Sequence, residues 1–170
     1  MTGTLRIRPA NPADAGAIAD LHVAVWRQAY ADLAPPEAIA RLDVAHRLPG
    51  WQAALAAGAP GATLLATRGV RPVGFVRFGP ASQPELGDAG EIKHLYVATD
   101  CTRQGIGRQL LSAALAGLKQ AGFNKAALAV VRGNDRALAF YRAQGGALCG
   151  SFTDAGPLWR SENLILRWVL

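Results

Sequence analysis

Residues 91–111 read EIKHLYVATDCTRQGIGRQLL and combine a strand, a glycine-containing turn and a helix start. The apolar and aromatic residues of the first part favour an extended strand that ends at Val97. From Gln104 onward, apolar residues recur every three or four positions, which predicts an amphipathic helix. Gly105 and Gly107 fall where this helix begins. A helix start exposes backbone N–H groups without intrahelical partners, and glycine lets a ligand approach them closely. The stretch therefore predicts a phosphate cradle.

The spacing of the glycines separates three kinds of phosphate-binding turn. A P-loop is excluded because it needs a lysine directly after its second glycine, and none follows Gly107. A dinucleotide fingerprint needs glycine or alanine where Leu110 stands. The remaining pattern is Gln/Arg-x-x-Gly-x-Gly/Ala after a strand that ends in Leu-x-Val. Residues 95–111 fit it and resemble motif A of the GCN5-related N-acetyltransferases. The first motif position falls on Thr102, so the neighbouring Arg103 is expected to supply the charge.

A second segment, residues 134–145, resembles the same family's N-x-x-A-x-x-F-Y pattern and its following glycine turn. Asn134 and Tyr141 lie two helical turns apart, so both can face one ligand. The resemblance implies that Tyr141 is the general acid that protonates a departing thiolate, since a phenol can donate at neutral pH. It implies that Asn134 holds the pantetheine arm or a water molecule. A core tyrosine with a satisfied hydroxyl is the alternative.

The resemblance implies acetyl-CoA (coenzyme A) as the acetyl donor. In the family, the end of the central strand pairs with the pantetheine arm, and a backbone N–H stabilises charge on the thioester oxygen. The glycine turn would hold the phosphates. The expected cofactor-binding residues are Leu95, Tyr96, Val97, Arg103, Gln104, Gly105, Ile106, Gly107, Arg108, Asn134 and Tyr141.

A general base is also needed, because an amine attacks a thioester only after it has lost a proton. Strand alternation predicts that Glu91 shares a face with Leu95 and Val97, whereas His94 lies on the other face. In the resembled family, a carboxylate at the place of Glu91 often takes the proton of the amine through water. Apolar neighbours would raise its pKa toward the useful range. His94 is the alternative base if its face meets the cleft, and Glu91 is then a solvated strand-end acid.

The N-terminal half is expected to form the acceptor side. Asn11, followed by proline, signals the start of an amphipathic helix, and shorter helices are predicted at residues 36–42 and 48–57. In the resembled family the first helices form one wall of the acceptor pocket, which implies Trp26 and Tyr30 as substrate contacts. Trp26 fits a core position equally well, because it lies on the apolar face of its helix.

The fold class expected from the order of elements is a mixed αβ sandwich formed by a single domain, residues 1–170. The resemblance implies a central, mostly antiparallel sheet with a splayed parallel pair and helices on both faces. Hydrophobic residues make up 51% of the chain and charged residues 18%, which is typical of a compact core. No membrane span, secretion signal or metal-ligand spacing is recognisable, so we expect a cytoplasmic protein without a membrane partner or a metal.

The net charge of +6 and the isoelectric point near 10.0 come mostly from arginine. Because the arginines are scattered singly, we expect them to attract an anionic cofactor and do not expect nucleic acid as a partner. The function implied is N-acetyl transfer from acetyl-CoA to a small-molecule or peptide amine by direct attack in a ternary complex. A non-catalytic acyl-CoA-binding or regulatory module on the same fold is one alternative, and a basic nucleic-acid-associated domain is another. The resemblance also allows a homodimer.

Overall fold

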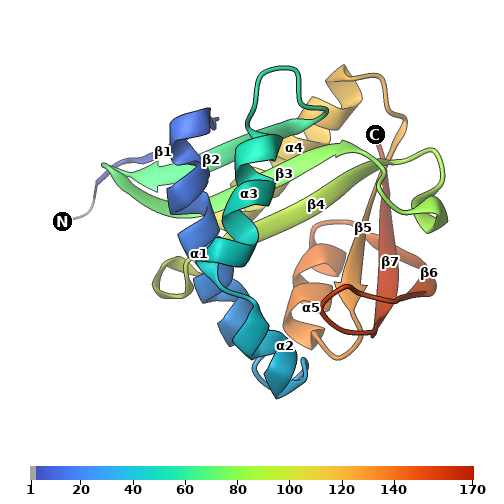
Figure 1. The fold of residues 1–170 in the computed structure, drawn as a ribbon. Coiled ribbons are helices and arrows are strands. Elements are labelled where there is room, and N and C mark those ends of the chain that lie inside the picture. Colours follow the sequence, from blue (N-terminus) through green and yellow to red (C-terminus); the bar gives the residue numbers. More distant parts are fainter. Residues whose placement is uncertain (1–2) are drawn as a thin grey trace.

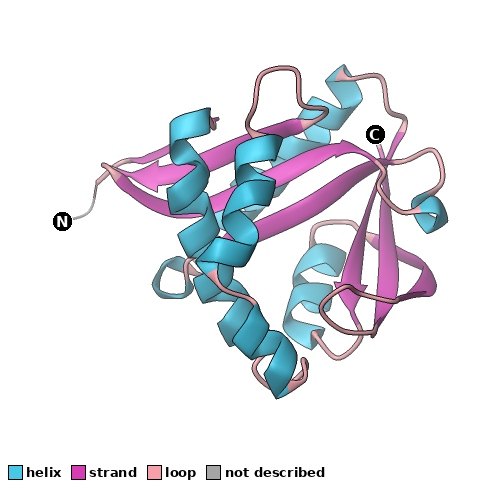
Figure 2. Ribbon diagram, in the orientation of Figure 1, coloured by secondary structure: helices cyan, strands magenta, loops and turns pink. Residues whose placement is uncertain are grey.

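The computed structural model describes residues 3–170 and contains a seven-stranded sheet with helices on both faces (Figures 1 and 2). The strand order is β1-β2-β3-β4-β5-β7-β6, and β4 and β5 form its parallel pair. All other neighbours are antiparallel, which confirms the expected fold class. The strands are β1 (Leu5–Pro9), β2 (Ala62–Arg68), β3 (Arg71–Pro80), β4 (Gly90–Val97), β5 (Lys125–Val131), β6 (Ala147–Asp154) and β7 (Ser161–Val169).

The α-helices are α1 (Ala15–Ala29), α2 (Pro36–Arg41), α3 (Val44–Ala54), α4 (Ile106–Gln120) and α5 (Asp135–Ala143). Short 3-10 turns are η1 (Pro12–Asp14), η2 (Pro84–Leu86) and η3 (Thr99–Cys101). Helix α3 begins four residues before the predicted 48–57 helix, because the Asp43 carboxylate caps it by accepting a hydrogen bond from the His46 amide at 2.7 Å. None of the helices within residues 3–170 is long and apolar enough to cross a membrane.

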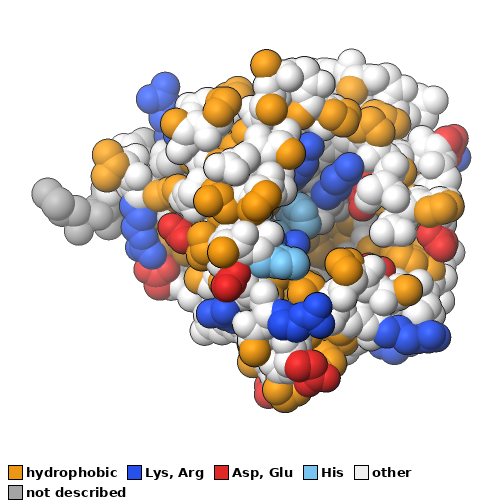
Figure 3. Space-filling view, in the orientation of Figure 1, with side chains coloured by type: hydrophobic (Ala, Val, Ile, Leu, Met, Phe, Trp, Pro, Cys, Tyr) orange, Lys and Arg blue, Asp and Glu red, His pale blue; other side chains and the backbone are white. Residues whose placement is uncertain are grey.

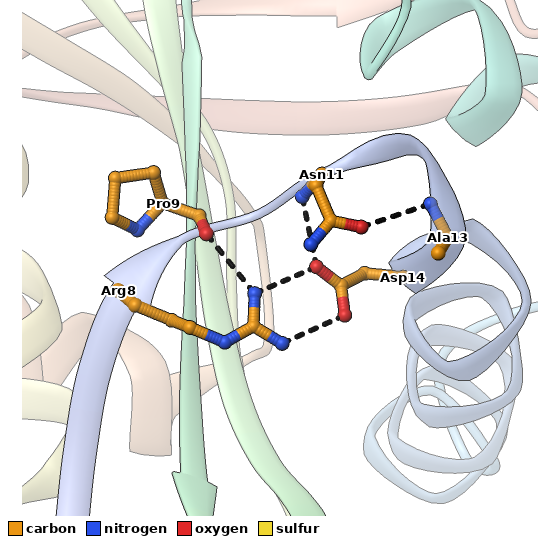
Figure 4. Close-up of polar contacts among 5 residues, drawn as sticks. All are labelled: Arg8, Pro9, Asn11, Ala13 and Asp14. Atoms are coloured by element: carbon orange, nitrogen blue, oxygen red, sulfur yellow. Dashed lines mark hydrogen bonds and ion pairs between the residues drawn. The ribbon is translucent and has the colours of Figure 1, made fainter.

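The chain enters α1 through a reciprocal cap at η1 (Figure 4). The Asn11 side chain accepts from the Ala13 amide at 3.0 Å, and the Asp14 carboxylate accepts from the Asn11 amide at 2.8 Å. Arg8 on β1 holds the same carboxylate through two hydrogen bonds of 2.8 Å. These contacts lower the pKa of Asp14, chiefly through the Arg8 hydrogen bonds. The cap therefore fixes the start of α1 to the edge of the sheet.

Each face of the sheet carries its own apolar layer. On one face, Leu110 of α4 packs with Ile92 of β4 in the largest cluster of buried residues. On the other face, Ile18 of α1 and Trp51 of α3 pack against Phe75 of β3. Figure 1 shows α1 and α3 in front of the sheet and α4 behind it. Strand β4 therefore separates a side covered by α4 from a side covered by α1 and α3.

The alternation of side chains along β4 is interrupted at Lys93. In the pairing with β3, Arg77 lies opposite His94 and Phe78 lies opposite Ile92, which leaves Lys93 as an extra residue. Ile92 and Leu95, three positions apart, consequently contact the same apolar cluster. The predicted common face of Glu91, Leu95 and Val97 is therefore incorrect, because this bulge turns Glu91 away from the other two.

Candidate active site

The central feature of the site is the opening between β4 and β5. In the described chain these strands are in register only at Gly90 with Ala126 and at Glu91 with Ala127. Beyond these pairs the strands diverge, as Figures 1 and 2 show, and both line a cavity of about 840 Å³. Because β3 occupies only one edge of β4, backbone groups on the other edge are left without a neighbouring strand. An extended ligand can pair with them as an added strand.

The start of α4 forms the mouth of this cavity. Arg103 has φ of 61° and the N-cap Gly105 has φ of 79°, so two left-handed residues bend the chain just before the helix. No side chain within residues 3–170 caps this helix start. The backbone amides of residues 106–108 are therefore available to an anion, and the helix dipole favours negative charge there. Gly105, Ile106, Gly107 and Arg108 all line the cavity.

Gly107 lies close to α5 at this mouth. A Cβ placed on Gly107 would lie 3.4 Å from the Phe140 ring of α5, so any larger branch would press on that ring. The residue has an ordinary helical conformation, whereas Gly105 is required for its left-handed φ. The two glycines thus serve different needs, one steric and one conformational.

Positive charge gathers along the same cavity. Lys93, Arg103, Arg108 and Arg136 line it, and no Asp or Glu does so among residues 3–170. Arg136 was not among the sequence-predicted residues, although a signal was present. An arginine in the first turn of α5 is opposed by the helix dipole, and a bound anion nearby would offset this repulsion. The cavity is therefore suited to a polyanionic ligand.

Tyr141 lies inside the cavity wall. It is 9% exposed and is packed edge-on against Phe140 and Trp168, with ring centroids at 5.1 and 6.1 Å. Burial raises the pKa of its phenol, so the hydroxyl stays protonated at neutral pH. Asn134 lies in the same wall, and its side-chain oxygen accepts from the Ala137 amide at 3.3 Å, which caps α5. The helix thus presents a protonated phenol to the cavity.

The two predicted acceptor contacts lie in different places. Tyr30 lines the cavity from the end of α1. Trp26 does not, because it is 6% exposed and belongs to a core cluster with Ala38 and Leu42. Its ring centroid is 4.9 Å from that of Tyr30. Trp26 therefore packs against Tyr30 and is not part of the cavity lining.

Glu91 and Gln104 are also placed outside the cavity lining. The Glu91 side chain is buried, and its carboxylate accepts hydrogen bonds from the amide and the hydroxyl of Ser82, at 2.7 and 2.6 Å. The bulge at Lys93 gives it this orientation. Gln104 is exposed, and its amide nitrogen donates to the Asp100 carbonyl at 3.4 Å. The other predicted cofactor-binding residues come together around the cavity.

His94 of β4 lies between two cavities. It lines the large cavity and also a smaller pocket on the face covered by α1 and α3. Burial lowers its pKa to about 3, assisted by the positive charges of Arg47, Arg77 and Lys93. The imidazole is therefore neutral at physiological pH and can accept a proton.

Comparisons with known proteins agree with this geometry. Residues 17–145 match the model of the Acetyltransferase (GNAT) family. The chain is 32% identical to the probable N-acetyltransferase Rv2775 of Mycobacterium tuberculosis over 65% of its own length, and the match spans 63% of that relative. Among solved structures, a GCN5-related N-acetyltransferase from Rhodopseudomonas palustris is 25% identical, with a TM-score of 0.77 over 100% of this chain and 98% of that one. The PaiA N-acetyltransferase from Thermoplasma acidophilum, solved with coenzyme A, has the same fold, with 19% identity and a TM-score of 0.76 over 98% and 99%. The chain therefore belongs to the Acetyltransferase (GNAT) family.

Proposed function

We propose that the protein is an N-acetyltransferase that uses acetyl-CoA and an amine acceptor in one ternary complex. The observation that carries the proposal is the meeting of two features in one cavity. The open edge of β4 offers backbone groups to an extended arm, and the start of α4 offers amides to phosphates. Family membership supports the reaction class, and the coenzyme A complex of the Thermoplasma protein supports the donor.

The residues fit acetyl-CoA along its length. The backbone of Leu95–Val97 would pair with the pantetheine arm, and the amides of residues 106–108 would bind the pyrophosphate. Arg103, Arg108 and Arg136 would neutralise the phosphates. Bound there, acetyl-CoA would supply an acetyl group on a thioester. Asn134, whose side chain caps α5, would hold the wall against which the arm lies.

Tyr141 is the proposed general acid. Its hydroxyl would donate a proton to the sulfur as the carbon–sulfur bond breaks and the carbon–nitrogen bond forms. The acceptor ammonium would lose one proton before attack, and its nitrogen would lose a second as the amide forms. One of the two would restore the phenol through solvent and the other would be released, so the overall proton count is balanced. Because the pKa of Tyr141 is raised, the phenol would remain protonated until the thiolate begins to form.

His94 is the proposed base, in place of Glu91. The Glu91 carboxylate lies outside the cavity and is held by Ser82. His94 lines both spaces, is neutral, and lies on the strand whose backbone would hold the thioester. An unprotonated imidazole nitrogen at this place would take up the proton that the acceptor ammonium must lose.

The first experiment is a calorimetric titration with acetyl-CoA of the wild-type protein, Gly107→Val and Gly16→Val. We expect micromolar binding that falls at least tenfold in Gly107→Val, because the new branch meets Phe140 at the mouth of the cavity. Gly16→Val is the matched control, since a Cβ on Gly16 has no neighbour within 4 Å. Equal acetyl-CoA affinity of the two variants would contradict phosphate binding at the start of α4.

The second arm measures release of the coenzyme A thiol with a panel of amines. Amine-dependent release supports the enzyme. Tight acetyl-CoA binding with no release for any amine would instead identify a non-catalytic acyl-CoA-binding module. No binding at all would remove the basis of the proposal.

A further inference from the structure

A second, smaller pocket lies on the acceptor side of β4, on the face covered by α1 and α3. Its volume is about 180 Å³, enough for a small polar group and a short side chain. Figure 3 shows this face hollowed, with histidine side chains gathered in the hollow and Lys or Arg side chains beside them. The side chains that line it with charge or hydrogen-bonding capacity are His22, His46, Arg47, Trp51, Arg77 and His94.

The arginines of this pocket have no acidic counterpart. The ion pairs within residues 3–170 involve Arg8, Arg71 and Lys125, and not Arg47 or Arg77. Arg77 donates only to neutral oxygens, those of Ala54, Pro60 and Thr63. No acidic side chain among the described residues lines the pocket. Its positive charge is therefore uncompensated by the protein.

The Arg47 side chain has no hydrogen-bond partner within residues 3–170, and its Nε is buried. Arg77 shows how an arginine in this region is otherwise held, with three acceptors around its guanidinium. A partly buried guanidinium without a partner destabilises the folded protein, because it has lost hydrogen bonds to water and no protein group replaces them. An anion with two oxygens would satisfy it through paired hydrogen bonds.

His22 supplies a second, independent observation. It is 1% exposed, and its Nδ1 accepts a hydrogen bond from Trp51 Nε1 at 3.1 Å. The proton of the neutral ring therefore resides on Nε2. This Nε2 has no partner in the described chain, although His22 lines the pocket. A buried N–H without an acceptor implies that a ligand oxygen completes it.

The imidazole ring of His94 separates the small pocket from the large cavity. His94 lines both spaces, and its ring centroid is 4.8 Å from that of His22. Tyr96, which lines the large cavity, has its centroid 5.0 Å from His22. A ligand anchored in the small pocket can thus extend past His94 to the edge of β4. An amine close to the anchoring anion would reach the place of acetyl transfer.

We propose that the acceptor is an amine that also carries a carboxylate, of the size of a free amino acid, and that the small pocket binds this carboxylate through Arg47 and the Nε2–H of His22. This inference rests on the proposed function, because it names the substrate class of that site. Polycationic amines are disfavoured, since they would bring further positive charge to Arg47 and Arg77. The carboxylate would also offset the positive charge near His94 and so favour proton uptake there.

The test compares kcat/KM for the common amino acids, for their amides and for spermidine. We expect at least one amino acid to exceed its amide at least tenfold. Arg47→Gln should remove that preference through KM, with acetyl-CoA affinity unchanged. Arg41→Gln is the matched control, because Arg41 is exposed on α2 and lines neither pocket. Equal or better use of amides or spermidine by the wild-type protein would overturn the proposal.

Binding of the carboxylate can be measured without turnover. Amino acids should raise the melting temperature of the wild-type protein, in the presence of coenzyme A, more than their amides do. This difference should disappear in Arg47→Gln and persist in Arg41→Gln. If acetyl-CoA fails to bind, the proposed function fails, whatever the amino acids do. If acetyl transfer occurs and neither kinetics nor melting distinguishes acids from amides, only the carboxylate pocket is refuted.

Discussion

Acidification should destabilise the protein through His22. This side chain is 1% exposed, and Trp51 donates a hydrogen bond to its Nδ1. Protonation would place the second hydrogen of the ring on Nδ1, where it would face the indole N–H of Trp51, and would put a charge beside Arg47 and His94. Burial first, and then the charges of His94 and Arg47, lower the pKa of His22 to about 2. The folded state thus excludes a proton that the unfolded chain takes up.

The sign and the size follow from this difference. The ordinary histidine pKa is about 6.5, so the unfolded state binds more protons below that value and stability falls as the pH falls. Each pH unit corresponds to about 1.4 kcal/mol for one such group, so lowering the pH from about 6.5 to about 5 costs about 2 kcal/mol through His22. The pKa of His94 is lowered to about 3, so it adds a loss of the same sign. Total stabilities of about 5–15 kcal/mol make such losses measurable.

The assay is urea unfolding at several pH values between about 5 and 8, with the wild-type protein and His22→Asn. Asparagine can still accept the Trp51 hydrogen bond but does not titrate. We expect the variant to be less stable at about pH 8 by about 1–3 kcal/mol, because ring volume is lost. Its stability should then fall with acid by about 1.4 kcal/mol less per pH unit than that of the wild type. Parallel curves for the two proteins would refute the assignment of a buried neutral His22.

Three further outcomes are expected. Tyr141→Phe should lower kcat by about 10²–10⁴ with acetyl-CoA affinity unchanged, because only the donated proton is lost; a kcat near the wild-type value would exclude Tyr141 as the acid. His94→Gln should lower kcat/KM at least tenfold, whereas Glu91→Gln should remain close to wild type, and the reverse order would restore Glu91 as the base. Gly117→Ala should destabilise the protein by about 1–3 kcal/mol in urea unfolding, since its Cβ would lie 2.6 Å from an aromatic ring of β3. Gly16→Ala, with no neighbour within 4 Å, should be neutral or stabilising, and an equal loss in both would argue against the steric cause.

Local sequence signals were sufficient to predict the elements of the donor side. The spacing of apolar residues predicted α4, and Leu110, Leu111, Ala114 and Leu118 are all buried in the structure. Asn134 starts the second family-like segment, and its side chain caps α5. These features were readable because helix periodicity and capping depend on residues within a few positions of one another.

The acceptor side was decided by the tertiary structure. The bulge at Lys93 arises from the pairing of β4 with β3, and it places Ile92 in the apolar cluster of Leu95 and turns Glu91 to the other face. The small pocket joins His22, Arg47 and His94 from α1, α3 and β4. The segments around His22 and Arg47 give no sign of such a pocket. Only the packing of two helices against one face of the sheet brings their unpartnered groups together, because such contacts depend on strand register and helix docking between distant segments.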